Sequence, residues 1–291
     1  IQSPGGCGAL RLGADFARRC NPETTAWVSD PTWANHIPLL GNAGLKLAQY
    51  PYYDSASHQL KFDQMTETLK QAKRGDLVLL HGCCHNPCGA DLSQAQWQSL
   101  AEMAETQGFI PYIDIAYQGF GDGLEEDAYG LRLMAERLPE IIVASSCSKN
   151  FGIYRERVGA LSIVADSAQA AKISTTQAAS IARGMYSMPP SHGAAAVSLV
   201  LNNVDLRQQW LAELAEMRDR INAMRVLLVE KLKFKNASQD FSFIQNQLGM
   251  FSFLGITPTQ VHQLRDQYSV YMVDSSRISI AGMNHTNIEY L

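Results

Sequence analysis

One lysine follows an apolar, β-branched run in the segment SSCSKNFGIYRERVG, which spans residues 145–159. The run IIVASS, residues 141–146, has the composition of a buried strand, so Lys149 should emerge just beyond the end of that strand. Ligands bind at this edge of parallel sheets. Arg157 follows shortly after the lysine, and this pairing predicts a Schiff base beside a bound phosphate.

Three further segments place polar groups at comparable positions. Asp114 and Tyr117 follow a second apolar strand in YIDIAYQGF, and Asn86 follows a third in HGCCHNPCG. In SPGGCGALR, three glycines precede an amphipathic stretch, so backbone N–H groups at a helix start could bind a phosphate. Each segment alone has an ordinary explanation, as a turn or a helix cap. Their joint occurrence predicts one site for a phosphate-bearing ligand.

Strand-like runs alternate with helical patterns along the chain. The runs lie near residues 26–30, 45–50, 76–82, 109–115, 141–146 and 158–164, with helical patterns at 93–108 and 127–138. This alternation predicts an α/β fold with a mainly parallel sheet covered by helices.

A long helical pattern over residues 205–232 suggests a connection to a second, smaller α/β domain. There, GMFSFLG, SVYMVDSS and RISIAGM have the composition of short strands around a helix that begins near Pro258. We therefore expect a large cofactor-binding domain over residues 1–204. The connecting helix and the small C-terminal domain should occupy residues 205–291.

Composition excludes several classes of protein. The net charge of -4 provides no basic surface for nucleic acid, and no apolar run approaches the roughly 20 residues that span a bilayer. The six cysteines show no disulfide framework, which favours a cytoplasmic protein. The first residue is Ile1, almost inside the glycine-rich motif, so we expect a fragment that lacks an N-terminal segment and the extreme C-terminus.

Taken together, the motifs identify a family. WVSDPTW, HNPCG, DIAYQGF, SKNFG with ERVG, YSMPP, GMFSF and SRISIAGM occur in order between Ser3 and about Met283. The chain resembles the class I (fold type I) aminotransferases that use pyridoxal 5'-phosphate, most closely the aspartate and aromatic amino acid aminotransferases. The resemblance implies a transaminase of amino acid metabolism that moves the amino group of aspartate or an aromatic amino acid to 2-oxoglutarate. It also implies a homodimer with shared active sites.

The resemblance assigns roles around the cofactor ring. Lys149 would form the Schiff base and then carry a proton between substrate and cofactor. Asp114 would pair with the pyridine nitrogen, while Tyr117 and Asn86 would bond to the ring hydroxyl. Trp33 would lie against the ring face.

The phosphate and substrate sites follow from the same resemblance. Backbone N–H groups from Gly6 onward, the Ser146 hydroxyl and the Arg157 guanidinium would hold the phosphate. Cys7 belongs to this set, although it replaces the family's Thr or Ser with a weaker donor. Arg277 would bind the α-carboxylate of the substrate, in a pocket that Trp33 and Asn86 also line.

Two residues bear on the side chain of the substrate. Arg183, just before YSMPP, corresponds to the residue that reaches the side-chain carboxylate from the neighbouring subunit. Met188 stands where aspartate-preferring members often carry Asn, so this end of the pocket is less polar.

Three alternatives compete with this interpretation. Ser146 to Lys149 fits the S-x-x-K of penicillin-binding enzymes, but the accompanying S-D-N and K-T-G motifs are absent. The Cys- and His-rich segment 81–88 suggests a metal-binding module, although adjacent cysteines at a strand end should point opposite ways, and we expect no metal. The chain could also be an inactive, cofactor-poor fragment of the family.

Overall fold

A seven-stranded sheet runs through the computed structural model, which describes residues 1–291. The strand order is β1-β9-β8-β7-β6-β2-β3. These strands are β1 (Gln2–Pro4), β2 (Thr25–Asp30), β3 (Lys46–Pro51), β6 (Leu77–His81), β7 (Ile110–Ile115), β8 (Ile141–Ser146) and β9 (Val158–Val164). Strands β3, β2, β6, β7 and β8 are mutually parallel, whereas β9 runs antiparallel to both β8 and β1. The predicted mainly parallel α/β sheet is confirmed.

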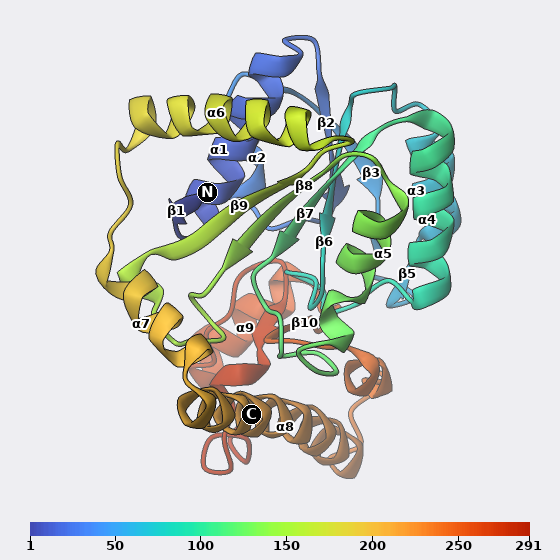
Figure 1. Cartoon of the computed structure of the whole chain (residues 1–291). Coiled ribbons are helices and arrows are strands. Elements are labelled where there is room, and N and C mark those ends of the chain that lie inside the picture. The colour runs from blue at the N-terminus through green and yellow to red at the C-terminus, as the bar shows by residue number, and fades with distance from the viewer.

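Helices cover both faces of this sheet (Figure 1). They are α1 (Gly5–Cys20), α2 (His36–Gly41), α3 (Phe62–Leu69), α4 (Gln94–Gln107), α5 (Tyr129–Arg137), α6 (Ala168–Met185), α7 (His192–Asn202), α8 (Val204–Phe234) and α9 (Pro258–Tyr268). Helices α3, α4 and α5 lie on one side and α1, α2 and α6 on the other. No helix is long and apolar enough to cross a lipid bilayer.

The sequence of β6 explains why the sheet has a core on each face. Side chains along a strand alternate between faces, so every residue of a doubly covered strand can be apolar. Leu77 and Leu79 belong to the core that contains residues of α1, whereas Val78 and Leu80 belong to the core that contains Trp97 of α4. The continuous apolar runs in the sequence therefore reflect burial on both faces.

The C-terminal part is built around α8, which crosses below the carboxyl ends of the central strands in Figure 1. Its buried face contributes Leu214, Ile221 and Leu228 to the same core as α4. The helix begins at Val204, next to the expected boundary at 204/205, and the division into two domains stays a prediction.

Small elements complete this region. Strands β10 (Phe251–Phe253) and β11 (Arg277–Ser279) form an antiparallel pair, and α9 begins at Pro258 behind a capping box made by Thr257. A second small pair consists of β4 (Tyr53–Asp54) and β5 (Gln59–Leu60).

The strand predicted in SVYMVDSS is wrong. The N–H of Val270 bonds to Leu264 O at the end of α9, and the N–H of Ser276 returns to Val273 O. These local turns use backbone groups that a ladder would need, so the alternating apolar residues form no strand.

Candidate active site

A cavity of about 170 Å³ lies beyond the carboxyl ends of β6, β7 and β8. Its walls consist of Gly6, Cys7, Leu10, Trp33, His81, Cys83, Asn86, Asp114, Ala116, Tyr117, Ser146, Ser148, Lys149, Tyr154 and Arg157. Because these strands are parallel, the loops that follow them meet at one edge of the sheet. The structure therefore brings together all the residues predicted to bind the cofactor.

Lys149 enters this cavity from the turn after β8. Its Nζ lies 4.1 Å from the centre of the Tyr117 ring, so the ammonium group faces an aromatic surface. Burial lowers the pKa of Lys149, as does Arg157, although the negative charge of Asp114 opposes that change. The amine is thus more easily freed of its proton than that of an exposed lysine, as nucleophilic attack requires.

Asp114 lies near the end of β7 and lines the cavity, and its carboxylate is held by a histidine. His36 Nε2 lies 3.0 Å from Asp114 Oδ2, and the imidazole is fully buried. Burial acts to raise the pKa of Asp114, but the hydrogen bond with His36, together with the electrostatic influence of the neighbouring His36, His81 and Lys149, holds this pKa below its usual range. The carboxylate therefore stays ionised, in the cavity that Lys149 also lines.

Another part of the cavity wall combines a helix start with an arginine. Gly5 has φ +74, and a Cβ atom there would lie 2.4 Å from Arg157 Nη2. Glycine thus lets the guanidinium approach the first turn of α1, where backbone N–H groups have no partner within the helix. Ser146 lies beside Gly6, whose added Cβ would be 3.1 Å from the serine Cβ. Positive charge, N–H groups and a hydroxyl converge here on a site suited to an anion.

Trp33 and Cys7 line the same cavity. The Trp33 ring packs edge-on against His36, with ring centroids 5.2 Å apart. Cys7 lies in the first turn of α1, and its sulfur has a distant contact with Asn35 Nδ2 at 3.8 Å. The thiol is a weaker hydrogen-bonding group than the hydroxyl of the family pattern.

Asn86 links the cavity to the C-terminal part of the chain. Its Nδ2 donates to Tyr117 Oη at 3.3 Å, and its Oδ1 accepts from Arg277 Nη1 at 3.1 Å. The Arg277 guanidinium also lies over the ring of Phe251, with Cζ 4.4 Å from the ring centre. One end of this guanidinium is therefore fixed beside the cavity.

Arg183 and Met188 lie outside the cavity. Arg183 is at the end of α6, exposed, and its Nη1 donates to Ser187 Oγ at 2.8 Å. Met188 is 75% exposed. Within one chain neither residue approaches Lys149.

Sequence reasoning did not identify His36, His81 or Tyr154 as part of the site. His81 and Tyr154 line the cavity, and burial lowers the pKa of His81 to about 3, so its ring is neutral. Thr32 Oγ1 connects His36 Nδ1, at 2.8 Å, with His81 Nε2, at 3.2 Å. The available signal for His36 was its place three residues after Trp33, since a turn in which the His36 N–H donates to Trp33 O at 2.8 Å brings the two rings together.

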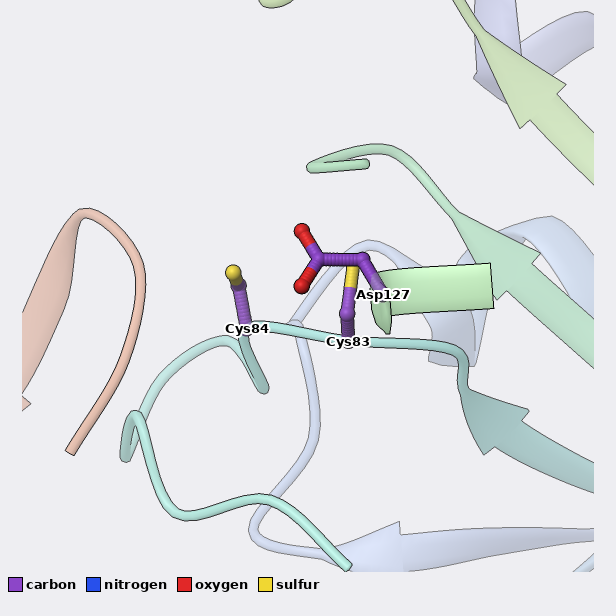
Figure 2. Close-up of side chains that lie close together, drawn as sticks. All are labelled: Cys83, Cys84 and Asp127. Carbon is purple, nitrogen blue, oxygen red and sulfur yellow. The ribbon is translucent and has the colours of Figure 1, made fainter. Parts of the chain in front are cut away.

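One argument against the metal-binding alternative, that adjacent cysteines should point opposite ways, is wrong. Cys84 has φ +51, which turns its sulfur to the same side as that of Cys83. Figure 2 shows both sulfurs facing the Asp127 carboxylate, and the three ligand atoms lie within 4.8 Å of one another. That carboxylate already accepts hydrogen bonds from four backbone N–H groups, those of Gly119, Gly121, Asp122 and Gly123. The hydrogen bonds of Asp127 thus stabilise the loop after β7, which explains the position of this carboxylate without a metal ion.

Comparison with known proteins agrees with this geometry. The chain matches the family model for class I and II aminotransferases over residues 1–291. It is 50% identical to an aspartate aminotransferase of Haemophilus influenzae, in an alignment that covers all of this chain and 74% of that relative. It is 47% identical to an aromatic-amino-acid aminotransferase of Paracoccus denitrificans, again over all of this chain and 74% of the relative.

A solved structure shows the same fold. The aromatic-amino-acid aminotransferase of Burkholderia pseudomallei, covalently bound to pyridoxal phosphate, superimposes with a TM-score of 0.98 at 46% identity. The match covers all of this chain and 73% of that structure. The chain therefore belongs to the class I and II aminotransferases, and the predicted fold, enzyme class and cofactor are confirmed.

The residues in the cavity fit this cofactor. Glycine at positions 5 and 6 leaves room that a side chain would fill, next to an arginine suited to a phosphate. His36 occupies only Oδ2 of Asp114, which leaves Oδ1 for a donor such as a protonated ring nitrogen. Lys149 lines the same cavity as these two groups.

Proposed function

We propose that this chain transfers the amino group of aspartate and of aromatic amino acids to 2-oxoglutarate, with Lys149 as the covalent anchor of the cofactor. The observation that carries this proposal is the position of Lys149, whose partly desolvated amine shares one cavity with Asp114 and Arg157. When bound, pyridoxal phosphate supplies an electron sink that stabilises negative charge at the α-carbon of an amino acid.

Each cavity residue has a role in this reaction. Once an amino acid substrate has displaced Lys149, the freed amine would remove the proton from the substrate α-carbon and deliver it to a carbon of the cofactor. Asp114 keeps the ring nitrogen protonated, because an ionised carboxylate in a buried site favours a neighbouring cation. Tyr117 and Asn86 hold the ring hydroxyl, and Trp33 shields the ring face.

The phosphate of the cofactor binds at the start of α1 and to side chains beside it. Backbone N–H groups of Gly6 and Cys7, the Ser146 hydroxyl and the Arg157 guanidinium surround the anion. The amide of Asn86 orients Arg277, which binds the α-carboxylate of either substrate.

A homodimer with shared sites explains the position of Arg183. Its exposed guanidinium serves the partner's site, where it binds the side-chain carboxylate of aspartate or 2-oxoglutarate. Exposed apolar residues of this region, Ile173, Met185, Met188, Leu199 and Leu201, are available to an interface. The six free cysteines favour a reducing cytoplasm as the compartment.

Mixed dimers test the shared site. Lys149→Ala chains combined with Arg183→Ala chains place both lesions in one site and leave the other intact. We expect partial recovery of aspartate activity on mixing. Absence of recovery, with chain exchange demonstrated by mass spectrometry of tagged chains, would contradict the shared site.

Product analysis tests the reaction itself. The holoenzyme is incubated with 2-oxoglutarate and either L-aspartate or L-phenylalanine, and the glutamate formed is measured. Glutamate should appear with both donors. Its absence with both would overturn the proposed function, whereas activity with one donor would fix the specificity.

A further inference from the structure

Arg225 lies on the inner face of α8, and none of the roles described above involves its guanidinium. The residue is 1% exposed and has no carboxylate partner. Burial lowers the pKa of Arg225 to about 10. Its Nη1 donates to Ile244 O at 3.2 Å and Ser252 Oγ at 2.6 Å, and its Nη2 donates to Gly249 O at 2.7 Å and Phe251 O at 2.9 Å. A buried charge held only by carbonyl and hydroxyl oxygens is costly, so its retention requires a specific reason.

The first connection from Arg225 to the active site runs through Phe251. Arg225 fixes the carbonyl of this residue, and the Phe251 ring supports the Arg277 guanidinium at 4.4 Å. Strand pairing places Phe253 directly opposite Arg277 in the two-stranded sheet. A shift of β10 would therefore move both the aromatic surface and the backbone that carry Arg277.

The second connection runs through Gly249. A Cβ atom at Gly249 would lie 2.4 Å from Cys84 Cβ, and the N–H of Leu248 donates to Gly89 O at 2.8 Å. The segment that Arg225 holds, residues 244–252, thus packs directly on the segment that carries Asn86. Since Asn86 Oδ1 accepts the hydrogen bond from Arg277 Nη1, both supports of Arg277 rest on this loop.

The third connection ties the loop to the rest of the protein. Ser252 Oγ accepts from Arg225 and donates to Gln247 Oε1 at 2.6 Å, and Gln247 Nε2 donates to Tyr53 Oη at 3.0 Å. Tyr53 belongs to β4, far from α8 in sequence.

We propose that Arg225 is a positioning residue for the reaction, which holds Arg277 in the orientation that binds the substrate α-carboxylate. This inference rests on the proposed function, in which Arg277 binds that group. Two Nη groups of one planar guanidinium reach four acceptors on one segment, residues 244–252, a geometry that the ammonium of lysine cannot reproduce. Arg225→Lys should therefore keep the charge and loosen the loop.

The experiment uses the holoenzyme and 3-phenylpropanoate as a competitive ligand with one carboxylate. Arg225→Lys should raise its inhibition constant and the KM for phenylalanine about tenfold, the effect of about 1.4 kcal/mol of binding free energy. The values of kcat and of the cofactor Kd should stay within about twofold, because the separate phosphate site is unchanged. The neutral analogue 3-phenylpropanamide should bind equally to parent and variant. Arg218→Lys, at a partly exposed ion pair of the same helix, is the matched control and should change none of these values.

A double-mutant cycle separates this inference from the proposed function. Arg277→Lys alone should also raise the inhibition constant, and adding Arg225→Lys should then have a much smaller effect, because the two residues act as one unit. No effect of Arg277→Lys would overturn the proposed role of Arg277. An effect of Arg277→Lys with none from Arg225→Lys, or full additivity in the double variant, would overturn only the inference.

Ser252→Ala keeps the test decisive if Arg225→Lys fails to fold. It removes one acceptor and leaves the three carbonyl contacts of Arg225 in place. We expect about a threefold rise in the inhibition constant of 3-phenylpropanoate, consistent with partial loss of a hydrogen-bond network. An unchanged constant would overturn the inference.

Discussion

His36 Nε2 and Asp114 Oδ2 lie 3.0 Å apart, although 78 positions separate the two residues in the chain. The other ring nitrogen of His36 lies 2.8 Å from Thr32 Oγ1, so both sides of the imidazole are fixed. A buried ring therefore holds Oδ2 of the carboxylate, while Oδ1 makes no hydrogen bond within the chain and the residue lines the cavity. This arrangement keeps Asp114 ionised and restricts the orientation of its carboxylate.

Replacement of this carboxylate should strongly impair catalysis. Asp114→Asn removes a buried charged hydrogen bond, a loss of about 2–5 kcal/mol, so kcat/KM should fall at least about thirtyfold. His36→Gln should cause a smaller fall, since the carboxylate remains. Steady-state kinetics with the cofactor Kd measured in parallel checks both variants. A fall for His36→Gln as large as that for Asp114→Asn would show that the histidine itself carries the effect.

Lys149→Ala should abolish transamination while the chain still binds the cofactor. The phosphate site at Gly6 and Arg157 is separate from the amine, so the loss of the covalent anchor leaves most anion contacts in place. Single-turnover transamination and equilibrium dialysis of pyridoxal phosphate measure the two properties. Activity within about tenfold of the parent, or about 1.4 kcal/mol of barrier, would mean that another group moves the proton.

The cavity could be predicted from the sequence because its reactive side chains lie at or just after the ends of strands. Lys149, Asp114 and Asn86 each come after an apolar run, and parallel strands bring such positions together at one edge. His36 was not found, because its partner lies far away in sequence and α2 is too short to show a helical pattern.

Other features depended on backbone detail that composition does not show. The φ of +51 at Cys84 reversed the expected direction of its side chain. Arg225 lies at a helical position where an arginine is usually exposed, and only the structure shows that it is buried against carbonyl oxygens. The local bonds of Val270 and Ser276 likewise replaced a predicted strand with turns.

Arg183→Ala should discriminate between the two classes of substrate. A bidentate contact with a side-chain carboxylate supplies about 1.5–3 kcal/mol, so kcat/KM for aspartate should fall about tenfold or more. The value for phenylalanine, which has no such carboxylate, should change little. Steady-state kinetics with both amino acids is the measurement. Equal losses would show that Arg183 supports the fold or the cofactor site and does not bind the side chain.

Protonation of His85 should destabilise the protein in mild acid. The ring is 1% exposed and lies 3.1 Å from both Ser29 Oγ and Cys88 Sγ. Burial lowers the pKa of His85 well below 6.5, and the neighbouring rings of His81 and His36 act in the same direction.

Between that lowered pKa and 6.5, the unfolded chain binds more protons at His85 than the folded protein does. The free energy of unfolding should therefore decrease as pH falls below 6.5, with a contribution from this residue that approaches about 1.4 kcal/mol per pH unit. His85→Gln cannot titrate, so urea unfolding at several pH values between 5 and 7 should show a smaller slope for the variant. Equal slopes for the parent and His85→Gln would contradict a neutral, buried His85.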